Sequence, residues 1–150
     1  MGECDVPFDD EVRSSYENGE DIRERAFRFA CRVVSFCQAL YDGGGVDRMM
    51  VPQLVNCSTS LAGMLEEARA AESKRDFISK CCIGLKECRE ARTRLRVCHA
   101  CQRGRGREAE LLAQEAQELT LIVGAIVRNT RRNAGISNPR SRNPKFTIRN

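Results

Sequence analysis

The sequence predicts an all-α protein, an antiparallel up-down-up-down four-helix bundle. Its apolar residues recur every three or four positions in four long segments, which is the spacing of one buried helix face. Aromatic residues make up only 5% of the chain and Trp is absent, so residues that favour strands are scarce. Short connections between long helices make neighbouring helices antiparallel. At 150 residues the chain suits one domain, which we place at residues 19–132.

The first helix is expected from Asp21 to the glycines of "YDGGGVD", which favour a reversal of the chain. Its buried face consists of Ile22, Ala26, Phe29, Val33, Phe36 and Leu40. The second helix is expected to begin near Met50, because Pro52 is tolerated in a first turn. Its buried face consists of Val51, Leu54, Ser58, Leu61, Leu65 and Ala68.

The third helix is expected from about Ser73 to Cys101, after a short break at residues 70–73. Its buried face consists of Phe77, Cys81, Gly84, Cys88, Ala91, Leu95 and Cys98. The stretch "QRGRGRE" interrupts the pattern, and a fourth helix then runs to about Arg132. Its buried face consists of Leu112, Ala116, Leu119, Val123 and Ile126.

Charge is distributed unevenly along the chain. Residues 1–24 carry nine acids and two arginines, a net charge of −7, so the rest of the chain carries +11 within the total of +4. Residues 1–18 are acidic and lack apolar periodicity, and we expect a flexible arm there. Residues 133–150, rich in Asn, Pro, Ser and Arg, are expected to form a basic flexible tail. This charge segregation favours a polyanionic partner.

The cysteine content and the start of the chain indicate a cytoplasmic protein. The chain has nine cysteines, but it opens with an acidic stretch rather than an apolar signal region, so we expect reduced thiols. The most apolar run, "LTLIVGAIV", is far shorter than the roughly 18 residues that a membrane-spanning helix needs. We therefore expect no membrane partner.

The stretch "RLRVCHACQRGRGRE" raises the question of a metal site, because it contains Cys98, the single histidine His99, and Cys101. Zinc needs four ligands, and the other closely spaced cysteines lie upstream on the same predicted helix, which cannot wrap round one ion. Haem attachment needs the histidine after the second cysteine, whereas His99 precedes it. We expect no metal and no cofactor, and interpret the cysteines of the apolar stripe as small packing residues.

Catalysis is not expected either. A ferritin-like di-iron centre requires Glu-x-x-His on two helices, and the chain has one histidine. That histidine lies among arginines, with no nucleophile and acid arranged around it. The glycines of "DGGGVD" lack the Lys-Ser/Thr ending of a phosphate-binding loop. The sequence thus predicts a protein that is not an enzyme.

The arginines are the candidate nucleic-acid-binding residues. They are Arg89, Arg92, Arg96, Arg103, Arg105, Arg107, Arg128, Arg131 and Arg132. The first three share one helix face, and the set is expected to gather at the end of the bundle near residues 101–107 or along its side. Guanidinium groups bind phosphate oxygens in pairs. No aromatic residue interleaves with them to stack bases, so backbone contacts rather than base reading are expected. The other interpretation is a solvated charged surface.

The segment "VPQLVNCSTSLAGMLEEA", followed by Phe77, resembles the proteins encoded by intervening sequences in bacterial large-subunit ribosomal RNA genes. The matching positions are Gln53, Leu54, Cys57, Ser60, Leu61, Leu65, Glu67, Phe77 and Glu90. That family is similar in fold to the accessory variability proteins of diversity-generating retroelements, which are basic homopentamers that bind nucleic acid and a reverse transcriptase. The resemblance, over about residues 19–132, implies a four-helix bundle and a homo-oligomer, a pentamer, with a basic surface.

Together these observations predict a non-enzymatic homo-oligomer that binds nucleic acid, structured RNA or RNA/DNA, through its basic surface. The alternative is a protein-interaction adaptor, such as an accessory subunit of a reverse transcriptase, whose arginines contact an acidic protein or only maintain solubility.

Overall fold

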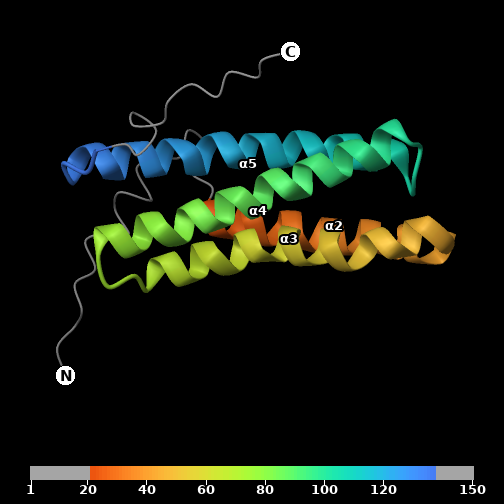
Figure 1. The fold of residues 1–150 in the computed structure, drawn as a ribbon, viewed down its shortest axis with the longest axis horizontal. Helices are drawn as coiled ribbons and strands as arrows, with labels where there is room; N and C mark the ends of the chain where they lie inside the picture. Colours follow the sequence, from red (N-terminus) through yellow and green to blue (C-terminus); the bar gives the residue numbers. More distant parts are fainter. Residues whose placement is uncertain (1–20, 138–150) are drawn as a thin grey trace, which may run out of the picture.

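A computed structural model describes residues 21–137, and these residues form four long antiparallel helices with no strand among them (Figure 1). The helices are α2 (Ile22–Gly43), α3 (Gly45–Arg69), α4 (Lys74–Ala100) and α5 (Gly106–Asn133). The predicted all-α bundle is confirmed. The expected acidic arm, and most of the expected basic tail, lie outside the described residues.

Each helix packs beside the next in the chain, and α2 also contacts α5, though less extensively, which closes the bundle. The turn between α2 and α3 and the connection between α4 and α5 lie at one end, and the turn between α3 and α4 lies at the other (Figure 1). All predicted core positions are buried except Val51, which is half-buried. The apolar period therefore identified the core correctly.

The start of α3 differs from the prediction. The helix begins at Gly45, not near Met50, so Pro52 lies in its interior rather than in its first turn. Gly44 and Gly45 have φ angles of 68° and 51°, and this left-handed pair reverses the chain within two residues. Pro52 is exposed, so its ring needs no place in the core.

The start of α4 agrees with the prediction. Ser73 caps the helix, and its hydroxyl accepts a 3.1 Å hydrogen bond from the backbone N–H of Asp76. Farther along, Gly84 lets α4 approach α3 closely, because a Cβ there would lie 3.2 Å from the Cβ of Met64. These two features fix where α4 starts and how it packs.

The first turn of α2 lies partway along α5. Arg25 of α2 donates hydrogen bonds to Glu115 at 2.7 and 2.9 Å, and it also pairs with Glu118. Its hydrogen bond to Glu115 is the largest of the interactions that raise the pKa of Arg25, so the guanidinium stays charged. At the far end of α2, Phe36 and Leu40 lie against Gly104 in the connection between α4 and α5.

Candidate nucleic-acid interface

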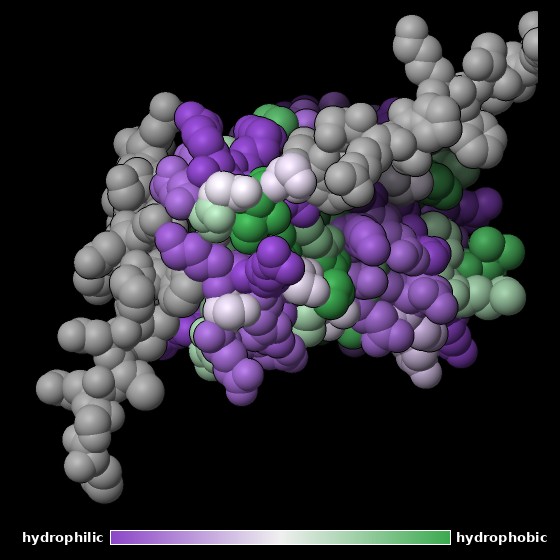
Figure 2. Space-filling model, turned by 60° about the vertical axis from the view of Figure 1, so that its left-hand side comes forward, coloured by the Kyte–Doolittle hydropathy of each residue, from purple (hydrophilic) through white to green (hydrophobic). Residues whose placement is uncertain are grey.

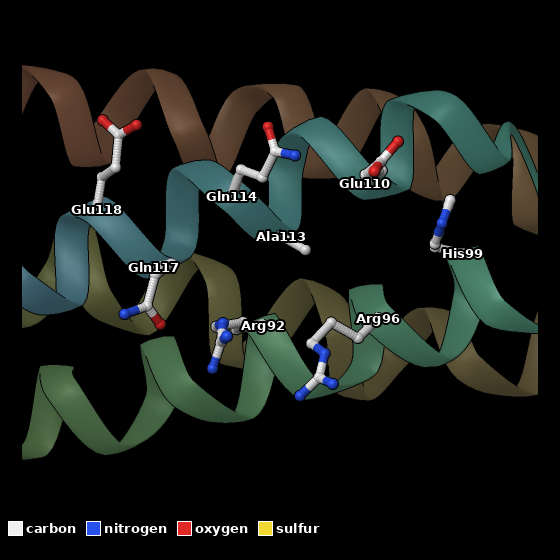
Figure 3. Close-up of a pocket in the computed structure, with 8 residues that line it drawn as sticks. All are labelled: Arg92, Arg96, His99, Glu110, Ala113, Gln114, Gln117 and Glu118. Atoms are coloured by element: carbon white, nitrogen blue, oxygen red, sulfur yellow. The ribbon is translucent and has the colours of Figure 1, made fainter.

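An open groove of about 520 Å³ runs between α4 and α5. On the α4 side it is lined by Arg92, Arg96 and His99, and on the α5 side by Glu110, Ala113, Gln114, Gln117 and Glu118 (Figure 3). The α4 wall therefore presents guanidinium groups, and the α5 wall presents carboxylates and amides. One small residue, Ala113, lies between these polar side chains.

The arginines of the α4 wall are not neutralised within the described part of the chain. The side chains of Arg92 and Arg96 make no hydrogen bond or ion pair among residues 21–137, and the same holds for the side chain of Arg89, which lies almost one turn earlier. In contrast, Arg94 points to the opposite side of α4, where it pairs with Glu90 at 2.5 Å. The arginines that face the α5 side are therefore available to an external anion.

Two arginines of α5 extend this surface along the side of the bundle. Arg131 reaches across to α4, where its guanidinium lies 3.5 Å from the Sγ of Cys82. Arg128, three residues earlier, shares its helix face and has no carboxylate partner in residues 21–137. Cys82 precedes Arg96 by 14 residues, so about 21 Å of helix separates the two groups. We name the combined surface the α4–α5 basic face: Arg89, Arg92, Arg96, Arg128 and Arg131.

The sequence did not decide whether the candidate arginines gather at one end of the bundle or along its side. In the structure the candidates divide between these two places. Because α4 and α5 are antiparallel, Arg128, Arg131 and Arg132 lie at the end opposite the connection at residues 101–105. Arg132, one residue after Arg131, donates to the side chain of Asn129 at 2.9 Å, so we do not count it in the α4–α5 basic face. The side of the bundle is therefore where most of the candidates come together.

The connection between α4 and α5 uses two of its arginines in the fold. Arg103 lies 3.6 Å from Asp47 of α3, and Arg105 pairs with Glu108 at 2.8 Å. Arg105 also donates to the backbone carbonyl of Ser35 at 3.4 Å. Of the three arginines in "RGRGR", Arg107, the second residue of α5, is the one whose side chain has no partner within residues 21–137. Sequence spacing could not identify these pairs, because the acids come from other elements or depend on the path of the loop.

Besides its arginines, the groove is lined by two carboxylates of α5, Glu110 and Glu118, and by the imidazole of His99 on α4. Glu118 is already paired with Arg25, whereas Glu110 has no partner among the described residues. His99 Nδ1 lies 3.0 Å from the backbone carbonyl of Gly106, and a carbonyl only accepts, so Nδ1 carries the proton. No local sequence pattern predicts this wall, because it forms only when α5 packs beside α4.

The comparisons with known proteins agree with this architecture. A family model described as "23S rRNA-intervening sequence protein" matches residues 20–125, more than half of the chain. The chain belongs to this family. No curated protein matches the sequence. A crystal structure of a protein of unknown function from Bacteroides thetaiotaomicron, assigned to the S23 ribosomal protein family, is similar with a TM-score of 0.66 and 25% identity. The match covers 71% of this chain and 98% of that one.

In this member of the family, the motif positions of α3 are mainly positions of the core. Leu54, Cys57, Leu61 and Leu65 are all buried. The shared pattern therefore reports the fold of the bundle. The arginines of the α4–α5 basic face lie outside that motif, so the resemblance alone did not identify them.

The cysteines of this family member are distributed between core and surface. Cys98 is buried, whereas His99 and Cys101 of the same stretch are exposed. Burial raises the pKa of the Cys37 and Cys81 thiols to about 12, so both remain protonated at neutral pH. Within residues 21–137, no group of three or more Cys, His, Asp or Glu is placed to hold a metal ion.

The exposed surface is mixed, and hydrophobic residues form separate patches on the face shown in Figure 2. Phe27, Val34 and Tyr41 repeat every seven residues on α2 and are 56%, 45% and 49% exposed. They form what we name the α2 apolar stripe. Arg48 of α3 stacks over the ring of Tyr41 at 4.3 Å, so the stripe borders α3. No helix within residues 21–137 has the length and apolarity needed to cross a membrane.

Proposed function

We propose that this chain is a non-enzymatic homo-oligomer, a pentamer, that binds structured nucleic acid, RNA or RNA/DNA, through the α4–α5 basic face. The observation that carries the proposal is the absence of a carboxylate partner for any of the five arginines of this face within residues 21–137. Elsewhere in the bundle, Arg25, Arg94, Arg103 and Arg105 each pair with an acid. Leaving five guanidinium groups unpaired on one side favours a polyanionic partner.

The chemistry of this face suits phosphate rather than bases. A guanidinium group binds two phosphate oxygens at once, and each contact releases counterions from the nucleic acid. No Phe, Tyr or Trp occurs between Phe77 and Phe146, so the imidazole of His99 is the one exposed ring that α4 and α5 offer for stacking a base. We therefore expect binding that depends on shape and backbone rather than on sequence.

The α2 apolar stripe supports the self-association that the family resemblance implies. It lies on the side of α2 away from α5, because Phe27 follows Arg25 by two residues, or about 200° of helix rotation. Since α4 is bordered by α3 and α5, the stripe and the α4–α5 basic face are on opposite sides of the bundle. A subunit contact through the stripe would leave the basic face open to nucleic acid.

The experiment replaces three arginines of the face together: Arg89→Gln, Arg92→Gln and Arg96→Gln. Each lost phosphate contact reduces the slope of log affinity against log salt by roughly 0.7 to 0.9, so three should reduce it by about 2 to 3. At 0.1 M salt this corresponds to a loss of affinity of roughly 100-fold. Fluorescence anisotropy with several unrelated RNA hairpins should give nearly the same loss for each.

The matched control removes the same charge from other sides of the bundle: Arg32→Gln, Arg69→Gln and Arg94→Gln. It should reduce affinity only slightly, because screened charges at a distance contribute little at this salt concentration. If the first variant remains folded and binds RNA with the affinity and salt slope of the parent, the α4–α5 basic face is not the nucleic-acid interface.

A second candidate function is that of a protein-interaction adaptor, such as an accessory subunit of a reverse transcriptase. The observation that favours it is the α5 wall of the groove, where Glu110, Gln114 and Gln117 offer acceptors and amides that a phosphate backbone does not need. An adaptor would bind RNA weakly, and Glu110→Gln would weaken its protein complex. In the nucleic-acid reading, Glu110→Gln should strengthen RNA binding, because it removes a negative charge beside Arg96.

A further inference from the structure

The acidic N-terminal segment is attached close to the groove. Asp21 caps α2, and Arg25, one turn later, pairs with Glu118. Glu118 lines the groove together with Arg92 and Arg96. Residues 1–20 therefore join the described part of the chain about one helical turn from a residue that contacts one end of the groove.

The segment also has the charge and the length to cover the arginines. Residues 1–20 hold seven carboxylates and one arginine, a net charge of −6. The carboxylates are Glu3, Asp5, Asp9, Asp10, Glu11, Glu17 and Glu20. Twenty extended residues span up to about 66 Å, whereas the whole of α5 is about 42 Å long. Every arginine of the α4–α5 basic face is thus within reach.

We propose that residues 1–20 bind the α4–α5 basic face of their own bundle and compete there with polyanions. A tethered segment has an effective concentration in the millimolar range, so several weak carboxylate–guanidinium pairs are enough to occupy the face. The competition with nucleic acid rests on the proposed function, but the contact between the segment and the bundle does not. The carboxylates of the segment pair with the guanidinium groups in place of phosphate. An external polyanion must therefore bind the face more strongly than the segment does in order to displace it.

The first experiment detects the contact without any nucleic acid. Phenylglyoxal modifies accessible guanidinium groups, and mass spectrometry of the full chain reports the rate at each arginine. In the parent at low salt, Arg89, Arg92 and Arg96 should react several-fold more slowly than in a variant with all seven acids replaced by amides (Glu3→Gln, Asp5→Asn, Asp9→Asn, Asp10→Asn, Glu11→Gln, Glu17→Gln and Glu20→Gln). High salt should remove the difference, because it screens the pairs.

Internal references make the result specific. Arg32, exposed on α2, should react equally in both proteins, and neutralising the exposed Glu66 and Glu67 of α3 should change nothing. Equal rates at Arg89, Arg92 and Arg96 in parent and variant would overturn the proposal. Protection confined to Arg140 and Arg142 would also overturn it, because the acidic segment would then pair with the basic end of the chain. Protection that grows with protein concentration would place the segment on another chain and overturn the intramolecular assignment.

The second experiment measures competition. The variant with seven amides should bind a 20-nucleotide RNA roughly five- to tenfold more tightly than the parent at low salt, because the parent must first release its own segment. If the protection of the arginines is present but neither protein binds RNA, the proposed function fails while the contact stands. If RNA binds both proteins with equal affinity, the competition is refuted even where the proposed function holds.

Discussion

A single glycine positions the arginines between α4 and α5. Gly104 has a φ of 61°, and a Cβ added to it would lie 3.1 Å from atoms of Phe36 and Leu40. The residue therefore faces α2, and its neighbours Arg103 and Arg105 reach Asp47 and Glu108 instead. In "RGRGR", Gly104 thus serves packing, and Arg103 and Arg105 form pairs with acids at the surface.

Replacing Gly104 by Ala should destabilise the protein by about 1–3 kcal/mol. A side chain in the left-handed region costs about 1–2 kcal/mol, and the close contact with Phe36 adds to it. Gly63→Ala is the control, since no atom lies within 4 Å of a Cβ at that exposed helical position. It should instead stabilise by about 0.5–1 kcal/mol. Urea unfolding followed by circular dichroism gives both values, and equal effects of the two substitutions would contradict this account.

At the level of single residues, the sequence identified which arginines could bind a polyanion, but not which of them form ion pairs with acidic side chains of the same chain. The i, i+3 and i+4 spacing placed Arg89, Arg92 and Arg96 on one face, because that follows from helix geometry alone. The pairing of Arg103 with Asp47 depends on how the loop returns to α3, which no local pattern encodes. Likewise, Glu110 and Gln114 became visible as a facing wall only once α5 was placed beside α4.

Among the helices, α3 is the element for which local sequence rules were misleading. The apolar period located all four helices and nearly every core position, because burial of one face dominates helix placement. A proline, however, was expected to mark a first turn, and Pro52 is the eighth residue of α3. The glycine reversal at Gly44 and Gly45 starts the helix earlier than the proline rule allows.

Replacing Pro52 by Ala should therefore stabilise the protein by about 1–2 kcal/mol. Proline is about 3 kcal/mol less favourable than Ala inside a helix, and part of this difference is offset because proline restricts the unfolded chain. The new N–H could donate to the carbonyl of Arg48, four residues earlier. Gln53→Ala, at the neighbouring exposed position, should change stability by less than about 0.5 kcal/mol. Thermal unfolding of the two variants decides the point, and a less stable Pro52→Ala variant would show that the proline is adapted to this helix.

At the scale of the whole molecule, the two conspicuous surfaces lie on opposite sides of the bundle. The α4–α5 basic face carries unpaired charge, and the α2 apolar stripe carries exposed apolar area beside α3. Leu121 of α5 is also exposed, whereas Leu85 of α4 is buried. The separation of these surfaces is compatible with a ring of subunits in which every basic face points to solvent.

The self-association proposed here should depend on the α2 apolar stripe. The parent should have a mass near that of five 16.9 kDa chains, about 85 kDa, by light scattering coupled to size exclusion at micromolar concentration. The double variant Phe27→Gln and Val34→Gln should shift towards 16.9 kDa, because it removes apolar area that is exposed in the single chain and buried only in a contact. Its helicity should be retained, since neither side chain belongs to the core. The control on the same helix, Arg28→Gln and Arg32→Gln, should keep the parent mass. A parent that is monomeric, or a double variant that keeps the full mass, would rule out the stripe as the subunit contact.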